Sequence, residues 1–279
     1  MVLLQIIRTI RLFSLDIVAG ALAALVYSAS VMGIELPRSY YLIMALTVWM
    51  IYAADHLMDG AKTRGKSDSG THNFFYTYKI PVILVFLIVL IFDFRLILYR
   101  LDHKIIEFGM APGMAAVAYL ILNRYYGDAP KWYFIKEPWI ALIYTIAIWG
   151  GPIIIAGDRV NPAQIIIIIS FFLLIMSNVL IYSIYEREED ARQGNKSFVK
   201  DFGLRAAVNM VVFSLVLSLA GVLSAYLFLG AKLYLTLPIL IIAAGMLQIT
   251  SFPMVFEKEK LYGIMADLLL LIFLLVLVY

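Results

Sequence analysis

Nine apolar runs of roughly 20 residues follow one another along this chain and constrain its fold more than any other feature. A helix of ~20 mostly apolar residues crosses a bilayer core of about 30 Å. The composition agrees, because 63% of the 279 residues are hydrophobic, 15% are charged and the mean hydropathy is +0.93. A soluble domain of this size is far less apolar. We therefore expect an all-α membrane protein that forms a single polytopic domain over residues 1–279.

The nine expected spans leave no stretch long enough for a separate soluble domain. The third is the least regular, because Asp93 and Arg95 interrupt it. The spans are expected at 12–32, 40–58, 80–99, 105–122, 138–156, 163–185, 206–229, 233–252 and 261–279.

The first run could also be a signal peptide, since Arg8 and Arg11 precede it and small residues follow. Asp16 inside the run argues against that alternative. We therefore treat the run as the first span.

Basic residues are distributed unequally between the two sides of a nine-span topology. With the N-terminus inside, 16 of the 22 Lys and Arg residues fall in cytoplasmic segments and the other six fall outside. Cytoplasmic loops of membrane proteins carry such an excess. The sequence thus predicts an integral protein of the cell's inner (plasma) membrane, with the N-terminus cytoplasmic and the C-terminus outside.

Two classes of chemistry are excluded by composition and charge pattern. The chain has no cysteine, so disulfides and thiolate catalysis are absent. Its basic residues lie singly in short loops and form no soluble basic face, which argues against nucleic acid as a partner.

Two acidic pairs with the same spacing follow the second and sixth spans. Asp55 and Asp59 end one apolar run, and Glu186 and Asp190 end the other, both on the predicted cytoplasmic side. Residues four apart on a helix project from one face. Two such pairs that face each other could bridge Mg²⁺ ions, which take one or two carboxylates and fill their other positions with water and substrate phosphates.

Basic residues accompany both pairs: Lys62, Arg64, Arg192 and Lys196. Acid alone would suggest a cation site, whereas acid with base suggests metal together with an anionic substrate. The alternative is an ordinary cytoplasmic loop in which the carboxylates pair with these neighbours. The repetition of the pattern, each time followed by Gly and Ser, favours the binding site.

The segment E186-x3-D190-x3-G194-x2-S197 resembles the second acidic motif of the UbiA superfamily of intramembrane prenyltransferases. Asp55 and Asp59 match the last two aspartates of that superfamily's first motif, N-D-x2-D-x3-D. The nine spans, with a motif after the second and the sixth, are similar to its layout over nearly the whole chain.

The chain departs from the family pattern at four positions. Ile51 and Tyr52 stand where the first motif begins with Asn and Asp, and Glu186 replaces an aspartate. A family Tyr-x3-Lys element at the end of the fourth helix has Tyr119 but Asn123 in the lysine's place, with Arg124 next.

The resemblance implies Mg²⁺-dependent transfer of a prenyl group from an isoprenyl diphosphate to a hydrophobic, lipid-soluble acceptor, aromatic by analogy, within the bilayer. Metal ions on the diphosphate would be held by the four acids: Asp55, Asp59, Glu186 and Asp190. The departing diphosphate would be neutralised by four bases: Lys62, Arg124, Arg192 and Lys196. Arg64, Tyr119 and Asn123 complete the substrate-binding set with Asn178, which lies near the helical face of Glu186.

Several alternatives stay open from the sequence. A non-catalytic relative that binds a prenyl lipid would explain the altered first motif. A transporter would place its polar residues nearer the midplane. The segment "DGAKTR" at 59–64 nearly matches the opening of the CDP-alcohol phosphotransferase signature, but the later aspartates of that signature are missing. Asn178 could serve only as an interhelical hydrogen bond, and His56 and His72 are expected to be local structural groups.

Overall fold

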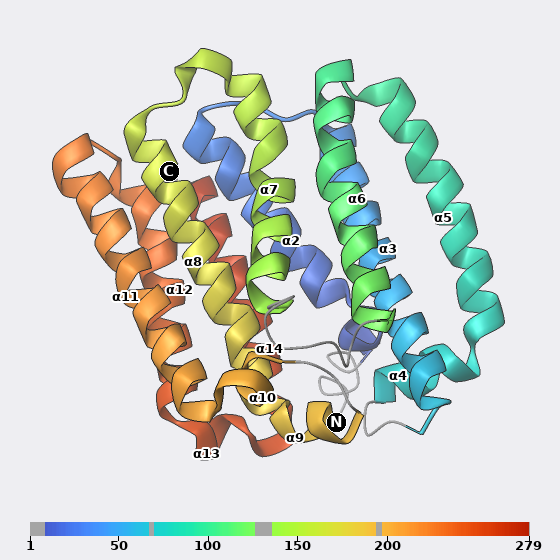
Figure 1. Cartoon of the computed structure of the whole chain (residues 1–279). Coiled ribbons are helices and arrows are strands. Elements are labelled where there is room, and N and C mark those ends of the chain that lie inside the picture. The colour runs from blue at the N-terminus through green and yellow to red at the C-terminus, as the bar shows by residue number, and fades with distance from the viewer. Residues whose placement is uncertain (1–8, 67–69, 126–135, 194–196, 279) are drawn as a thin grey trace. The chain divides into compact units, whose positions relative to one another are not determined.

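A computed structural model describes residues 9–66, 70–125, 136–193 and 197–278, and every regular element within these ranges is a helix. Nine of the described helices are long and apolar enough to span a membrane (Figure 1). This confirms the expected fold class and the number of spans. The chain is an integral membrane protein.

The spanning helices, with the 3₁₀ turns that extend two of them, are α2 (Leu15–Met32), α3 (Arg38–Thr63), α5 (Lys79–Arg100), α6 (His103–Tyr125), α7 (Lys136–Ala156) with η1 (Gly157–Arg159), α8 (Pro162–Tyr185), α11 (Leu204–Leu229), α12 (Leu233–Ser251), and α14 (Leu261–Leu270) with η3 (Leu271–Val278). Shorter elements lie between them: α4 (Gly70–Thr77), α9 (Arg187–Gln193), α10 (Phe198–Phe202), α13 (Pro253–Phe256) and η2 (Lys258–Lys260).

The chain divides into two compact units that are described separately below. Unit 1 comprises Met1–Leu22 and Leu36–Glu107, and unit 2 comprises Ala23–Glu35 and Phe108–Tyr279. The single domain expected from the sequence stays a prediction.

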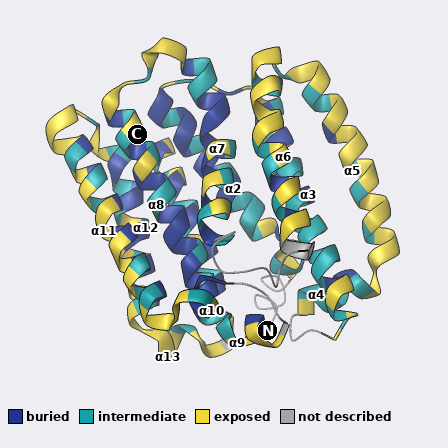
Figure 2. Ribbon diagram, in the orientation of Figure 1, coloured by how far each residue is buried: buried dark blue, intermediate teal, exposed yellow. Residues whose placement is uncertain are grey.

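In unit 1, α5 presents nearly all of its length to the outside of the protein, as the yellow ribbon in Figure 2 shows. The span expected at 80–99 is confirmed, because α5 runs unbroken from Lys79 to Arg100 although Asp93 and Arg95 interrupt its apolar run. Asp93 is 2% exposed and accepts a 2.9 Å hydrogen bond from Thr47 Oγ1 of α3. A buried acid in a span is tolerated when a neighbouring helix supplies a partner.

In unit 2, α8 lies between α7 and α11 and carries the densest part of the core (Figure 1). Four buried aromatic side chains from different elements pack there: Tyr27, Trp149, Phe171 and Phe273. The Tyr27 hydroxyl donates 2.6 Å to the carbonyl of Leu235, so this polar group is satisfied inside the bilayer core.

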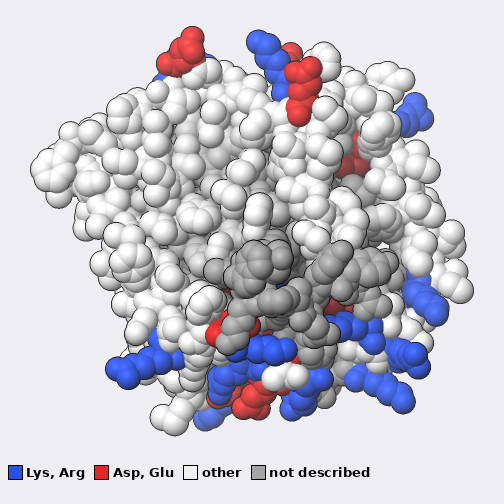
Figure 3. Space-filling view, viewed as in Figure 1, with Lys and Arg blue, Asp and Glu red and all other residues white. Residues whose placement is uncertain are grey.

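The outer surface agrees with a lipid environment. Broad areas in Figure 3 show neither basic nor acidic side chains. Most residues of α5 and many of α11 have exposed apolar side chains. Exposing such side chains costs free energy in water but not in lipid.

Candidate functional site

The first acidic pair lies entirely within α3. The sequence led us to expect this helix to end at Met58, but it continues to Thr63, where Arg64 terminates it in a left-handed conformation with φ 52°. Asp55 and Asp59 are therefore one turn apart on a continuous helix, as predicted, and both are half-buried.

Gly60 explains how a neighbouring element reaches this pair. A Cβ atom at position 60 would lie 2.6 Å from the backbone oxygen of His72 in α4, so only glycine allows the two helices to approach this closely. The approach places His72 Nε2 3.7 Å from Asp59 Oδ2. The sequence did not indicate this contact, because no local motif relates His72 to Asp59.

His56 takes part in contacts between helices. Its Nε2 lies 3.0 Å from the Ser14 hydroxyl, and its ring packs 5.2 Å from Phe75 and 5.5 Å from His72, measured between centroids. These contacts agree with the structural role that we expected for it.

The second acidic pair straddles a break between helices. α8 ends at Tyr185, where the sixth span was expected to end, Glu186 is its C-terminal cap, and α9 begins at Arg187. The Asp190 amide donates 2.8 Å to the Glu186 carbonyl, which keeps the two acids one helical turn apart despite the break. Asp190 is buried, with 8% exposed.

Glu186 has an environment that favours its neutral form. Partial burial raises its pKa to about 7, and the nearby Asp190 carboxylate adds to the effect, while Lys136 partly opposes it. Its Oε1 accepts a 3.2 Å hydrogen bond from the Tyr262 hydroxyl. The Tyr262 ring stacks on Tyr185, with centroids 4.4 Å apart and 6° between planes, so the donor is held in place.

Three side chains cap the start of α10, the helix that follows the second pair. Glu137 Oε1 accepts from the Phe198 amide at 2.7 Å, and the Ser183 and Ser197 hydroxyls accept from the next two amides. Glu137 is 1% exposed. We did not predict Glu137 or Tyr262 as part of this region; the only sequence signal for Glu137 was an acid at the first turn of an apolar span.

The predicted substrate-binding residues are distributed as follows. Lys62, Arg64 and Arg192 are exposed. Tyr119 is half-buried in α6. Lys196 and the side chains of Asn123 and Arg124 lie outside the part of the chain that the structure describes.

Asn178 is tied to another helix. Its amide nitrogen donates 3.3 Å to the carbonyl of Ala266 in α14, and the side chain is 7% exposed. One turn further along α8, the Tyr182 hydroxyl is 2.5 Å from Asp267 Oδ2. These contacts favour the interhelical alternative for Asn178.

The donor chemistry of the acidic pairs fits Mg²⁺. Among the described residues, no three His, Asp or Glu side chains gather as a ligand set. Each pair by itself offers two carboxylates, which is the number that Mg²⁺ takes when substrate phosphates and water complete its shell. In the second pair the two acids repel each other in a desolvated place, a repulsion that a divalent cation would remove.

Two solved structures are similar to this chain over almost its whole length. One is described as the apo structure of a UbiA homolog from Aeropyrum pernix K1, with 12% identity, a TM-score of 0.66, and 95% of this chain and 98% of that chain covered. The other is described as a digeranylgeranylglyceryl phosphate synthase in membranes, with 15% identity, a TM-score of 0.52, and 98% and 93% covered. No family model and no curated protein sequence matches the chain. At this identity the likeness establishes the fold.

Proposed function

We propose that this membrane protein, which has the fold of the UbiA prenyltransferases, transfers a prenyl group from an isoprenyl diphosphate to a hydrophobic acceptor with the help of Mg²⁺. The observation that carries the proposal is the Glu186 and Asp190 pair. Two acids that share a desolvated place at the end of a span have a destabilised charged state unless a cation joins them. The shared fold and the first acidic pair, Asp55 and Asp59, support the same function.

The proposed metal ligands are the four acids: Asp55, Asp59, Glu186 and Asp190. When bound, Mg²⁺ supplies positive charge that stabilises the departing diphosphate. Lys62, Arg124, Arg192 and Lys196 are proposed to donate hydrogen bonds to the remaining phosphate oxygens.

The reaction breaks the bond between the first prenyl carbon and the diphosphate oxygen, and the electron pair leaves with the diphosphate. Aromatic faces stabilise the allylic cation that remains. The acceptor then forms a bond to this carbon and loses a proton. We propose an aromatic ring or another lipid-soluble nucleophile as acceptor.

The membrane topology that we propose follows from the distribution of basic residues. Both acidic pairs then lie on the cytoplasmic side of the plasma membrane, with the N-terminus inside and the C-terminus outside. Water-soluble diphosphate would be released into the cytoplasm.

The test is incubation of the purified protein with isoprenyl diphosphates of several chain lengths and Mg²⁺, followed by mass spectrometry for diphosphate and prenylated products. Asp55→Asn and Asp190→Asn remove a negative charge at nearly constant size, so the rate should fall by about 10²-fold or more. Asp158→Asn is the matched control, because Asp158 is exposed in η1 and belongs to neither pair.

Equal rates in all three variants would exclude the acidic pairs as the catalytic site. If the wild type releases diphosphate from no donor but retains prenyl lipids, the chain is a binding relative and the enzymatic proposal is wrong.

A further inference from the structure

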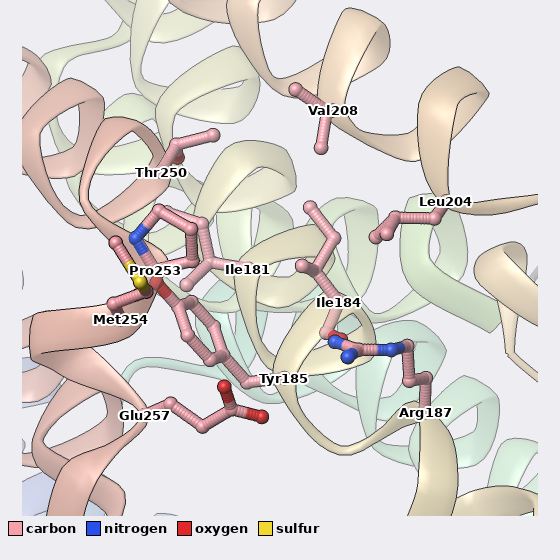
Figure 4. Close-up of a pocket in the computed structure, with 10 residues that line it drawn as sticks. All are labelled: Ile181, Ile184, Tyr185, Arg187, Leu204, Val208, Thr250, Pro253, Met254 and Glu257. Carbon is pink, nitrogen blue, oxygen red and sulfur yellow. The ribbon is translucent and has the colours of Figure 1, made fainter.

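A cavity of about 280 Å³ lies in unit 2 outside the proposed catalytic residues. Figure 4 shows its lining, which comes from the end of α8 and start of α9, the first turns of α11, and the region around α13. None of the four proposed metal ligands lines it. The cavity therefore needs its own explanation, which does not depend on the proposed reaction.

The cavity lies where three spans meet the membrane boundary. Candidate spans end at Tyr185 and Ser251 and another begins at Leu204, and residues at or next to all three positions line the cavity. Beside it, α13 and its N-cap expose Phe252, Met254 and Val255, of which Met254 is 82% exposed. Exposed apolar side chains at this depth are typical of a segment in contact with lipid.

The wall and the rim of the cavity differ in polarity. Ile181, Ile184 and Val208 form apolar wall on the side of the spans, whereas Arg187 and Glu257 come just after the ends of spans. A ligand with an apolar chain and a polar headgroup matches this change in polarity from wall to rim. The volume suits a headgroup and its first methylenes.

The two charged side chains have opposite sign and lie apart. Figure 4 draws the Arg187 guanidinium and the Glu257 carboxylate on different sides of the cavity. Arg187 Nη1 donates 2.9 Å to the Ile184 carbonyl, which holds the guanidinium at the rim, and its Nη2 lies 3.9 Å from Oε1 of the exposed Glu188. The fork of five N–H donors leaves groups that can bind a phosphate, which would compete with this exposed ion pair. One cation and one anion match a zwitterionic headgroup.

The Glu257 carboxylate distinguishes between zwitterionic headgroups. A carboxylate accepts charge-assisted hydrogen bonds from a primary ammonium, which a quaternary choline cannot donate. Choline is recognised by aromatic faces, but the lining tyrosine, Tyr185, is stacked on Tyr262 and donates its hydroxyl to Ile249 at 2.6 Å. An anionic headgroup without an amine would leave the Glu257 carboxylate without a cationic partner.

We infer that the cavity is a binding site for an ethanolamine phospholipid, with the phosphate at Arg187, the ammonium at Glu257 and the first methylenes against Ile184 and Val208. The site differs from an unspecific lipid contact because it discriminates between headgroups of the same chain length.

The experiment is native mass spectrometry of the purified full-length chain with equal amounts of phosphatidylethanolamine, phosphatidylcholine and phosphatidylglycerol that carry identical chains. We expect the ethanolamine lipid to be retained about tenfold over the other two, the factor that one charge-assisted hydrogen bond can supply. Glu257→Gln should abolish the preference over phosphatidylglycerol, and Glu257→Lys should reverse it.

Glu35→Gln is the matched control, because Glu35 is an exposed acid of the same unit that does not line the cavity, and it should keep the wild-type preference. Equal retention of the three lipids by the wild type would overturn the inference. So would an unchanged preference in both Glu257 variants, since these alter an exposed side chain and leave the fold intact.

Discussion

Glu186 should couple Mg²⁺ binding to proton release. Its pKa is raised from 4.5 to about 7, so at pH 6 the folded protein holds a proton there that the metal must displace. Affinity for Mg²⁺ should therefore increase with pH up to about 7 and then level off. Calorimetry at pH 6 in buffers of different ionisation enthalpy measures the proton released, and Glu186→Gln should release none.

The same shift affects the metal-free fold with a definite sign. Between pH 4.5 and 7 the folded state binds more protons at Glu186 than the unfolded state, so this residue makes the protein less stable as pH rises through that window. If Mg²⁺ binding were independent of pH and the wild-type protein released no proton on binding, Glu186 would not be a metal ligand.

Glu137 should stabilise the protein by accepting a hydrogen bond from Phe198, a residue far away in the sequence. Glu137→Ala leaves the Phe198 amide at the start of α10 without its acceptor, and a buried donor without a partner costs about 1–3 kcal/mol. Glu137→Gln keeps an acceptor oxygen and should lose less. Thermal melting in detergent measures both. Glu107→Ala is the control, since that acid is mostly exposed and should change the melting temperature little.

At this scale the sequence predicted the acids but not the groups that hold them. Asp55, Asp59 and Asp190 were found from spacing, because spacing along one chain segment survives folding. Glu137 and Tyr262, and the contact of His72 with Asp59, were missed because each side chain meets its acid or its amide from another helix. The sequence separation of 61 between Glu137 and Phe198 leaves no local signal.

Among the elements, the close approach of α3 and α4 depends on Gly60. Gly60→Ala would put a Cβ 2.6 Å from a backbone oxygen, which cannot move as a side-chain tip can. The helices should separate at a cost of about 1–3 kcal/mol, and His72 should leave Asp59. Thermal melting measures the first effect, and the NMR chemical shift of the His72 ring, which reports on its surroundings, measures the second.

Gly113→Ala in α6 is the matched control, because a Cβ there meets nothing within 4 Å. Alanine favours a helix over glycine, so this variant should be neutral or slightly more stable. An equal response of the two variants would mean that helix propensity and not packing governs position 60.

Helix limits could be predicted from hydropathy to within a few residues, but local helix propensity does not explain two of them. Hydropathy falls at Met58, but α3 continues to Thr63 although Asp59, Gly60 and Thr63 are poor helix formers, so local propensity does not explain the extra turn, which packs closely against α4 at Gly60. At Glu186 the residues on both sides favour a helix, so local propensity gave no sign that α8 ends at Tyr185 and α9 begins at Arg187.

For the whole molecule, the clearest prediction is the membrane topology. The chain has no cysteine, so single Cys variants report cleanly. Exposed positions Lys66 and Glu188 should react with an impermeant maleimide only from the cytoplasmic side, and Lys104 and Asp158 only from the outside. Labelling of Lys66→Cys and Glu188→Cys from opposite sides would refute nine spans with this orientation.

The hydrogen bond between Thr47 and Asp93 bears on how the protein is made. Translation completes α3 before α5, so the hydroxyl that donates to one carboxylate oxygen of Asp93 has already been made when Asp93 emerges. An insertion machinery that released each helix into lipid as soon as it was made would leave Asp93 in the bilayer without a hydrogen-bond partner. If α3 were held beside the exit of the insertion machinery until α5 emerges, the two helices would enter the membrane as a pair with the hydrogen bond between Thr47 and Asp93 formed.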